Sequence, residues 1–209
     1  MKNILLLLLA TMLTCNSYAA PLTHSQNYIC LDQPVMGLPN VLEFFSFYCP
    51  HCYEFEKEWR SNKTVQNNFP LHSKLIKYHI TNLGGEMGNT ITRAWAIAMM
   101  MGLEEKVILP IFEGVLIKKN IVDPVSLKTV FIESTGIQAK QYDIAWNSPV
   151  IDALCAQQGK VARDMHLKGI PTMIINGKYM INSDEFDTSS IATYVQQYAD
   201  LVQFLLHKK

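Results

Sequence analysis

Two cysteines separated by a proline and a histidine, Cys49-Pro50-His51-Cys52, are the residues of this chain best suited to do chemistry. They follow a largely apolar run, 41–48, that is typical of a buried strand, and Pro50 favours the first position of a helix. Cys49 is then the N-cap, where free backbone N–H groups and the helix dipole favour a thiolate. The thiolate is the reactive form, and Cys52, one turn further on, can attack a mixed disulfide that Cys49 forms. The motif therefore predicts a redox-active pair of thiols.

Half of a zinc site is the alternative interpretation of two cysteines at this spacing. The sequence offers no second pair of ligands, because Cys30 and Cys155 stand singly. The remaining histidines have no ligand spacing either: His24, His72, His79, His166 and His207. We therefore expect redox chemistry without a bound metal or cofactor.

Length and composition limit the remaining function classes. The chain has 209 residues, enough for one domain or one domain with an insertion. Hydrophobic residues make up 49% and charged residues 17%, which favours a packed core and argues against disorder. Lysine plus arginine and aspartate plus glutamate balance at 18 each, with no basic block, so nothing in the composition indicates a nucleic-acid surface.

The N-terminus has the features of an export signal. Lys2 supplies the positive charge, residues 4–10 supply the apolar stretch, and Ser17-Tyr18-Ala19 supplies a small-x-small cleavage site. The apolar stretch is too short to span a bilayer comfortably. We expect residues 1–19 to be a signal peptide that is cleaved after Ala19, which also removes Cys15.

Export changes the interpretation of the cysteines, because four remain after cleavage and exported proteins commonly form disulfides. If Cys49 pairs with Cys52, then Cys30 and Cys155 are left for each other, and we expect a structural disulfide between them. That bridge would close a loop of about 125 residues and, in the chain-entropy model, stabilise the fold by roughly 4–5 kcal/mol. The alternative is that both are buried free thiols that pack as small apolar side chains.

Periodicity and capping residues predict the order of the elements. Strands are expected at 41–47 and 75–80, with a helix from Pro50 between them. Helices are then expected over 90–102, 103–117 (broken or kinked at Pro110), 124 to about 136, and 149 toward 169. Asn176-Gly177 predicts a hairpin between strands 172–175 and 178–181, and Asp187 or Thr188 is expected to cap a last helix ending near Leu206.

A mixed sheet interrupted by a helical insertion fits this order of elements best. Residues 20–81 and 158–209 are expected to form the domain that contains the sheet. Residues 82–157 are expected to form the helical insertion.

The chain resembles the DsbA family of bacterial periplasmic thiol–disulfide oxidases over essentially the whole mature sequence. The resemblance lies in residues 43–53, Glu113-Gly114-Val115, Ala145-Trp146-Asn147-Ser148, Asn176-Gly177-Lys178-Tyr179 and residues 195–200. It implies an α/β architecture, a thioredoxin fold with a helical domain inserted. It also implies that Pro171 is a cis-proline facing the disulfide, and that Ile170 before it binds substrate, its backbone pairing with an extended segment beside Cys49.

Three titratable side chains are further candidates for the site. An unpaired carboxylate in an apolar strand is costly, so Glu43 must be neutral, hydrated or paired. The resemblance places Glu43 below the disulfide, with Lys77 and Glu56 near it, as a proton route to Cys52; the alternative is a buried acid neutralised by Lys77. We also expect His51 to act in catalysis, because a cationic or donating imidazole favours the Cys49 thiolate.

These observations predict an exported dithiol oxidase that donates its Cys49–Cys52 disulfide to reduced proteins. The resemblance implies a periplasmic location and reoxidation by a quinone-linked membrane oxidase of the DsbB type. We expect a monomer, because no separate dimerisation segment precedes the domain. Two alternatives use the same fold: a disulfide isomerase or reductase, which must be kept reduced, and a non-catalytic binding module, against which the two intact cysteines argue.

Overall fold

The computed structural model describes residues 26–63 and 75–208, so the predicted signal peptide lies outside the described residues. Within them, five strands form one sheet in the order β1-β5-β4-β2-β3. The strands are β1 (Tyr28–Cys30), β2 (Val41–Phe45), β3 (Leu75–His79), β4 (Thr172–Ile175) and β5 (Tyr179–Ile181). Strands β2 and β3 are parallel, and the other neighbours are antiparallel. The predicted mixed sheet is confirmed.

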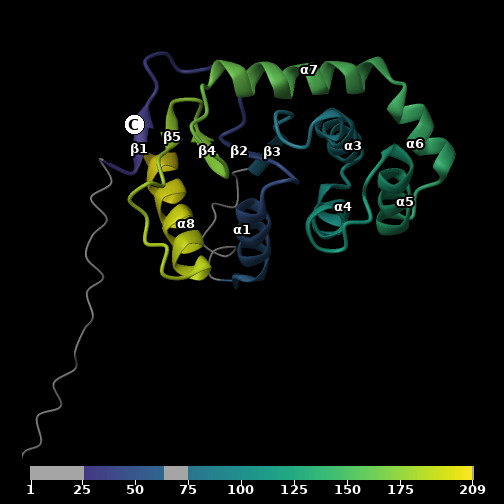
Figure 1. Ribbon diagram of the computed structural model, residues 1–209. Coiled ribbons are helices and arrows are strands. Elements are labelled where there is room, and N and C mark those ends of the chain that lie inside the picture. Colours follow the sequence, from purple (N-terminus) through teal and green to yellow (C-terminus); the bar gives the residue numbers. More distant parts are fainter. Residues whose placement is uncertain (1–25, 64–74, 209) are drawn as a thin grey trace, which may run out of the picture.

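Strand β2 is buried on both faces, as its apolar run predicts. Val41 packs toward the helices α1 (Pro50–Ser61) and α8 (Ile191–His207), which lie side by side on one face of the sheet (Figure 1). Leu42 packs on the opposite face, against the C-terminal part of α7 (Pro149–Asp164). Because only residues 46–49 separate the end of β2 from the start of α1, the redox motif lies at the C-terminal end of this central strand.

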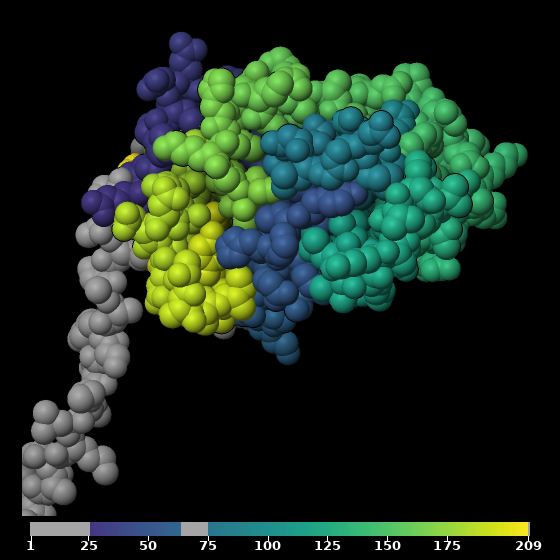
Figure 2. Space-filling model, viewed as in Figure 1, coloured from purple at the N-terminus to yellow at the C-terminus, as the bar shows by residue number. Residues whose placement is uncertain are grey.

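The helices between β3 and α7 form a cluster beside the sheet. They are α3 (Glu86–Met101), α4 (Glu104–Phe112), α5 (Pro124–Thr135) and α6 (Ala139–Trp146), with a π-helical segment η1 (Glu113–Ile117) after α4. Their core includes Trp95, Phe112 and Phe131, and it continues into Phe45 of β2 and Phe47 just after that strand. In Figure 2, the blue surface that includes α1 lies between the yellow surface of α8 and the teal surface of these helices. The redox motif is therefore held from both sides.

Several helix ends follow the predicted capping residues. Asp123 accepts a hydrogen bond from the Ser126 N–H at 2.7 Å and caps α5, which ends at Gly136 in the left-handed conformation. Gly102 ends α3 in the same way, and its N–H donates to the Ala98 carbonyl. Asn176 and Gly177 both have positive φ, as the hairpin turn requires.

Other elements differ from the prediction. The cap of α8 is Ser190, whose hydroxyl oxygen accepts the Thr193 N–H at 3.0 Å, and not Asp187 or Thr188. The Asp187 carboxylate instead accepts the Ser189 N–H at 2.7 Å and closes the turn before the helix. Pro110 stays inside α4, and the irregular backbone follows it as η1. The short strand β1 and the helix α6 were not predicted, because β1 is three residues long and α6 starts at Gln138, a weak N-cap residue.

Candidate active site

Cys49 is the N-cap of α1, as predicted, and Pro50 takes the first helical position. The Cys49 sulfur accepts a hydrogen bond from the Cys52 N–H at 3.1 Å. The N–H of Cys49 donates to the Ser46 carbonyl at 3.0 Å, so residues 46–49 form a tight turn between β2 and the helix. Both cysteines are buried, and the structure shows them as free thiols, the reduced form of the pair. The local backbone therefore directs helix N–H groups at one sulfur of the two.

The two thiols have opposite acidities. The Cys52 side chain, hydrogen-bonded to the Cys49 sulfur, lowers the pKa of Cys49 to about 7, with help from the N–H groups of Cys52 and His51 and against the effect of burial. Burial raises the pKa of Cys52 far above its ordinary value, and the neighbouring Cys49 adds to this. At neutral pH Cys49 is thus partly a thiolate, whereas Cys52 keeps its proton. This asymmetry suits Cys49 as nucleophile and leaving group.

The peptide bond between Ile170 and Pro171 is cis, as the resemblance implied. The Ile170 carbonyl oxygen lies 3.8 Å from the Cys49 sulfur. The Pro171 carbonyl accepts a hydrogen bond at 2.8 Å from the hydroxyl of Tyr198, a residue of α8. Tyr198 is a residue of this site that sequence reasoning did not single out, although it lies in the 195–200 segment of the resemblance. This hydrogen bond thus anchors the cis-proline loop that faces Cys49 and Cys52.

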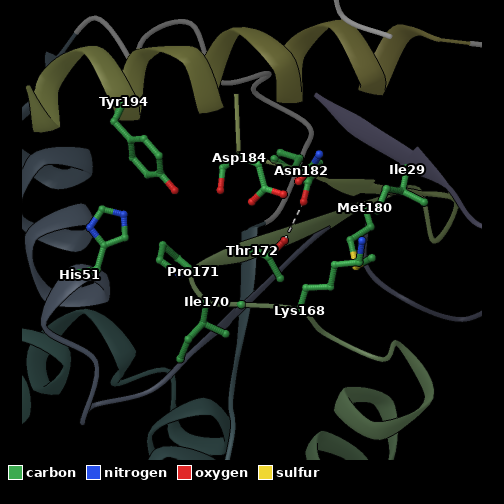
Figure 3. Close-up of a pocket in the computed structure, with 13 residues that line it drawn as sticks. Ile29, His51, Lys168, Ile170, Pro171, Thr172, Met180, Asn182, Asp184 and Tyr194 are labelled. Carbon is green, nitrogen blue, oxygen red and sulfur yellow. Dashed lines mark hydrogen bonds between the residues drawn. The ribbon is translucent and has the colours of Figure 1, made fainter. Parts of the chain in front are cut away.

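His51 is exposed on the first turn of α1, and its ring packs against Tyr194 of α8 with ring centroids 4.9 Å apart. In Figure 3 the two rings lie on the same side of Pro171. They line a groove of about 220 Å³ together with residues of the cis-proline loop and of β5, including Ile170, Pro171, Thr172 and Met180. The structure therefore brings His51, Ile170 and Pro171 to one surface. The role of His51 in catalysis stays a prediction.

Glu43 is paired and buried. In the parallel register, Glu43 of β2 lies directly beside Lys77 of β3, and the Lys77 ammonium donates to it. The same ammonium donates to Glu56 of α1 at 2.7 Å. Burial raises the pKa of Glu43 even though Lys77 opposes the shift, and the pKa of Lys77 is raised because the two carboxylates outweigh its burial. One ammonium thus lies between two carboxylates below the redox helix.

The predicted disulfide between Cys30 and Cys155 is absent from the structure, in which both are free thiols on different elements, β1 and α7. Cys30 is exposed on β1, at the edge of the sheet, opposite Tyr179 of β5. Cys155 is half-buried on α7, where it packs against the helical core. The two side chains lie in different surroundings, and counting the cysteines could not reveal this.

The described residues contain neither a cluster of metal ligands nor a helix that could span a membrane. Across residues 26–63 and 75–208, no three histidine, cysteine, aspartate or glutamate side chains gather as a metal would require. In the same part of the chain, none of the helices is both long and apolar enough to cross a bilayer.

Comparison with known proteins places the chain in a family. The model of the DSBA-like thioredoxin domain matches residues 40–198. The thiol:disulfide interchange proteins DsbA of Yersinia pestis and Escherichia coli (strain K12) are 47% and 45% identical to it, with 100% of both chains covered. Proteus mirabilis DsbA, solved with a non-covalently bound peptide, is 39% identical, with a TM-score of 0.81 over 90% of this chain and 100% of that one.

A second solved structure, SrgA of Salmonella enterica serovar Typhimurium, is 32% identical, with a TM-score of 0.79 over 87% of this chain and 99% of that one. These similarities extend over the sheet and the helical cluster alike, so they include every element that positions the two cysteines. The chain belongs to the DsbA family of thiol:disulfide oxidoreductases.

Proposed function

We propose that the protein oxidises pairs of cysteine thiols in newly exported proteins, using a disulfide between Cys49 and Cys52. The observation that carries this proposal is the unequal pair of thiols. Helix N–H groups and the Cys52 side chain stabilise a thiolate at Cys49, with its pKa near 7, while Cys52 is a buried thiol. Stabilising the thiolate favours the reduced dithiol over the disulfide, so it makes the disulfide more oxidising than the same pair would be with both thiols at their ordinary pKa.

The reaction takes two exchanges. A client thiolate attacks the Cys49 sulfur, the Cys49–Cys52 bond breaks, and its electron pair goes to Cys52, which takes up a proton. A second client thiolate then attacks the client sulfur of the mixed disulfide and expels Cys49 as a thiolate. The client gains a disulfide, and two electrons remain on the enzyme as the Cys49–Cys52 dithiol.

The Ile170–Pro171 segment is proposed as the docking edge for the client. Its backbone lies beside the nucleophile, and an extended peptide can pair with the main chain of Ile170 while its cysteine reaches Cys49. A related protein, Proteus mirabilis DsbA, has been solved with the peptide PWATCDS bound non-covalently. That complex supports an unfolded segment with a cysteine as the kind of client that this surface accepts.

Glu43 and Lys77 are proposed as the proton route to Cys52. The leaving Cys52 sulfur needs a proton, and a carboxyl group whose pKa is raised by burial holds one more readily than an exposed acid. The alternative is a purely structural role for Glu43, which would also explain its ion pair with Lys77.

The cellular setting follows from the same proposal. The export signal at residues 1–19 and the family support a periplasmic protein that acts on reduced exported proteins. We propose that it acts as a monomer. We infer that a quinone-linked membrane oxidase of the DsbB type removes the electrons. Residues 20–81 and 158–209 are proposed as the thioredoxin-like domain and residues 82–157 as the inserted helical domain.

A redox titration of the mature protein against glutathione tests the direction of electron flow. We expect the pair to be mostly reduced in mixtures where most structural disulfides persist, and the oxidised protein to introduce disulfides into a reduced, unfolded model protein. The Cys49→Ser variant should lose this activity entirely. The Cys52→Ser variant should lose it as well, because neither variant can form the Cys49–Cys52 disulfide that accepts the client's electrons.

The same titration separates the alternatives. A pair that stays mostly oxidised would indicate a reductase or isomerase, and a pair that does not exchange with glutathione would indicate a binding module. Either result contradicts the proposed oxidase.

A further inference from the structure

His79, the last residue of β3, is fully buried behind the turn that carries Cys49. Its ring stacks on Phe47, with centroids 5.3 Å apart. Its Nδ1 lies 2.7 Å from the Thr92 hydroxyl of α3, and its Nε2 lies 3.4 Å from the Ser46 hydroxyl. Its backbone N–H donates to the Gln158 side chain of α7 at 2.9 Å. One imidazole thus links the active-site turn to the helical cluster.

The positions of the protons follow from the partners. Thr92 has a single hydroxyl proton, which it donates to the Gly88 carbonyl at 2.9 Å, as threonine in a helix commonly does. Its oxygen must then accept from His79, so Nδ1 carries the ring proton. Burial lowers the pKa of His79 to about 3, so the ring is neutral and Nε2 is bare. Nε2 therefore accepts the proton of the Ser46 hydroxyl.

The hydrogen bonds are donated in one direction, from the redox turn through Ser46 and His79 to Thr92 and Gly88. The Ser46 oxygen accepts the Tyr48 N–H at 3.2 Å, and the Ser46 carbonyl accepts the Cys49 N–H. Ser46 is fully buried, so its hydroxyl needs the acceptor that His79 supplies. If His79 had the other tautomer, Nε2 would donate to the Ser46 oxygen and could not accept the Ser46 hydroxyl proton, and Nδ1 would face the Thr92 oxygen without a proton to donate.

We propose that His79 is a positioning residue of the redox centre, which holds the Ser46–Cys49 turn through its Nδ1–H tautomer so that the Cys49 sulfur faces the helix N–H groups. It does not touch Cys49, and it acts through Ser46. The inference rests on the proposed function only in that the thiolate of Cys49 matters for oxidation. Its tests read the thiol and the imidazole directly and need no client protein.

The tautomer can be read by ¹⁵N NMR of the reduced protein labelled at histidine. The His79 signals, assigned by their loss in His79→Gln, should show a protonated Nδ1 and a bare Nε2, without titration between pH 5 and pH 8. A ring protonated at Nε2, or an imidazolium in this range, would overturn the proposal.

The coupling to Cys49 is tested with two variants that leave His79 in place. Thr92→Val removes the acceptor of the Nδ1 proton, and Ser46→Ala removes the hydroxyl that Nε2 holds. Both should raise the midpoint of Cys49 alkylation by about half a pH unit, a threefold loss of thiolate, and shift the glutathione equilibrium in the less oxidising direction.

Thr135→Val is the matched control. Thr135 is also buried, and its hydroxyl donates to the Phe131 carbonyl at 2.7 Å within α5, away from the redox turn. It should lower the unfolding temperature about as much as Thr92→Val does while leaving the Cys49 midpoint unchanged. If Thr92→Val and Ser46→Ala lower the unfolding temperature but also leave the Cys49 midpoint unchanged, His79 has a structural role alone and the proposal fails.

Discussion

Cys49 and Cys52 are three residues apart, yet the protein gives them opposite properties. Cys49 lies where the first turn of α1 presents its N–H groups, and Cys52 lies one turn inside, buried among apolar side chains. The resulting acidities set the order of the reaction, because the thiol of lower pKa is the better leaving group. His51 contributes its N–H to Cys49, while its ring turns toward Tyr194.

Alkylation of the reduced protein should show this asymmetry. The rate at Cys49 should rise with pH around a midpoint near 7, and Cys52 should stay unreactive. The unfolded chain keeps protons on Cys49 up to its ordinary pKa near 9, so the reduced protein should gain stability as pH rises from 7 to 9 and lose it on the way down. A midpoint near 9 would contradict the assignment.

The His51→Ser variant isolates the imidazole, since it keeps the backbone N–H. If the ring acts as predicted, the alkylation midpoint of Cys49 should rise and the glutathione equilibrium should shift roughly threefold to tenfold in the less oxidising direction. An unchanged equilibrium would limit the role of His51 to its backbone and its contact with Tyr194.

At the scale of elements, α8 supports the docking edge, the Ile170–Pro171 segment, because its Tyr198 contacts both that segment and the redox helix α1. Tyr198 donates to the Pro171 carbonyl and packs edge-on against Phe55 of α1, with ring centroids 5.0 Å apart. One aromatic side chain therefore fixes the spacing between the cis-proline loop and the helix that carries the cysteines.

The Tyr198→Phe variant removes this hydrogen bond and keeps the ring. Loss of one buried hydrogen bond of about 1 kcal/mol should raise the KM for a dithiol peptide about fivefold, with little change in kcat. Tyr142→Phe is the control, because the buried Tyr142 hydroxyl has no hydrogen-bond partner among the described residues. If both variants have the wild-type KM, Tyr198 does not support the docking edge.

At the scale of the molecule, the Lys77 ammonium ties β2, β3 and α1 together through its two carboxylates. Glu43 is the costly member, because burial raises its pKa while the unfolded chain ionises it freely. Stability due to this group is therefore highest below its unfolded pKa of about 4.5 and falls as pH rises through its raised folded pKa.

The Glu43→Gln variant separates a proton route from a structural ion pair. Urea denaturation should show that the variant gains stability relative to the wild type as pH rises from 4.5 to 7, since Glu56 remains paired with Lys77. If Glu43 relays the proton, the rate of Cys52 release should also fall about tenfold, a modest loss because water can replace the carboxyl in part. A more stable variant with the wild-type rate would leave only the structural role.

The sequence alone determined the local features. Cys49-Pro50-His51-Cys52 predicts a helix N-terminus with a reactive thiol, because proline and capping residues act over one turn. Asp123, Gly136 and Asn176-Gly177 likewise mark helix ends and a turn through their own backbone preferences. The resemblance to the family supplied the fold and the cis-proline, which local preference does not encode.

Only the tertiary structure decided the contacts between distant segments. His79 meets Ser46 and Thr92 because β3 pairs with β2 and passes α3, and Tyr198 meets Pro171 because α8 returns across the sheet. The same packing gives Cys30 an exposed position at the sheet edge and Cys155 a place against the helical core, so the predicted bridge does not form. Hydrogen bonds and burial between residues far apart in the sequence depend on how whole elements pack. The local sequence around each residue does not determine that packing.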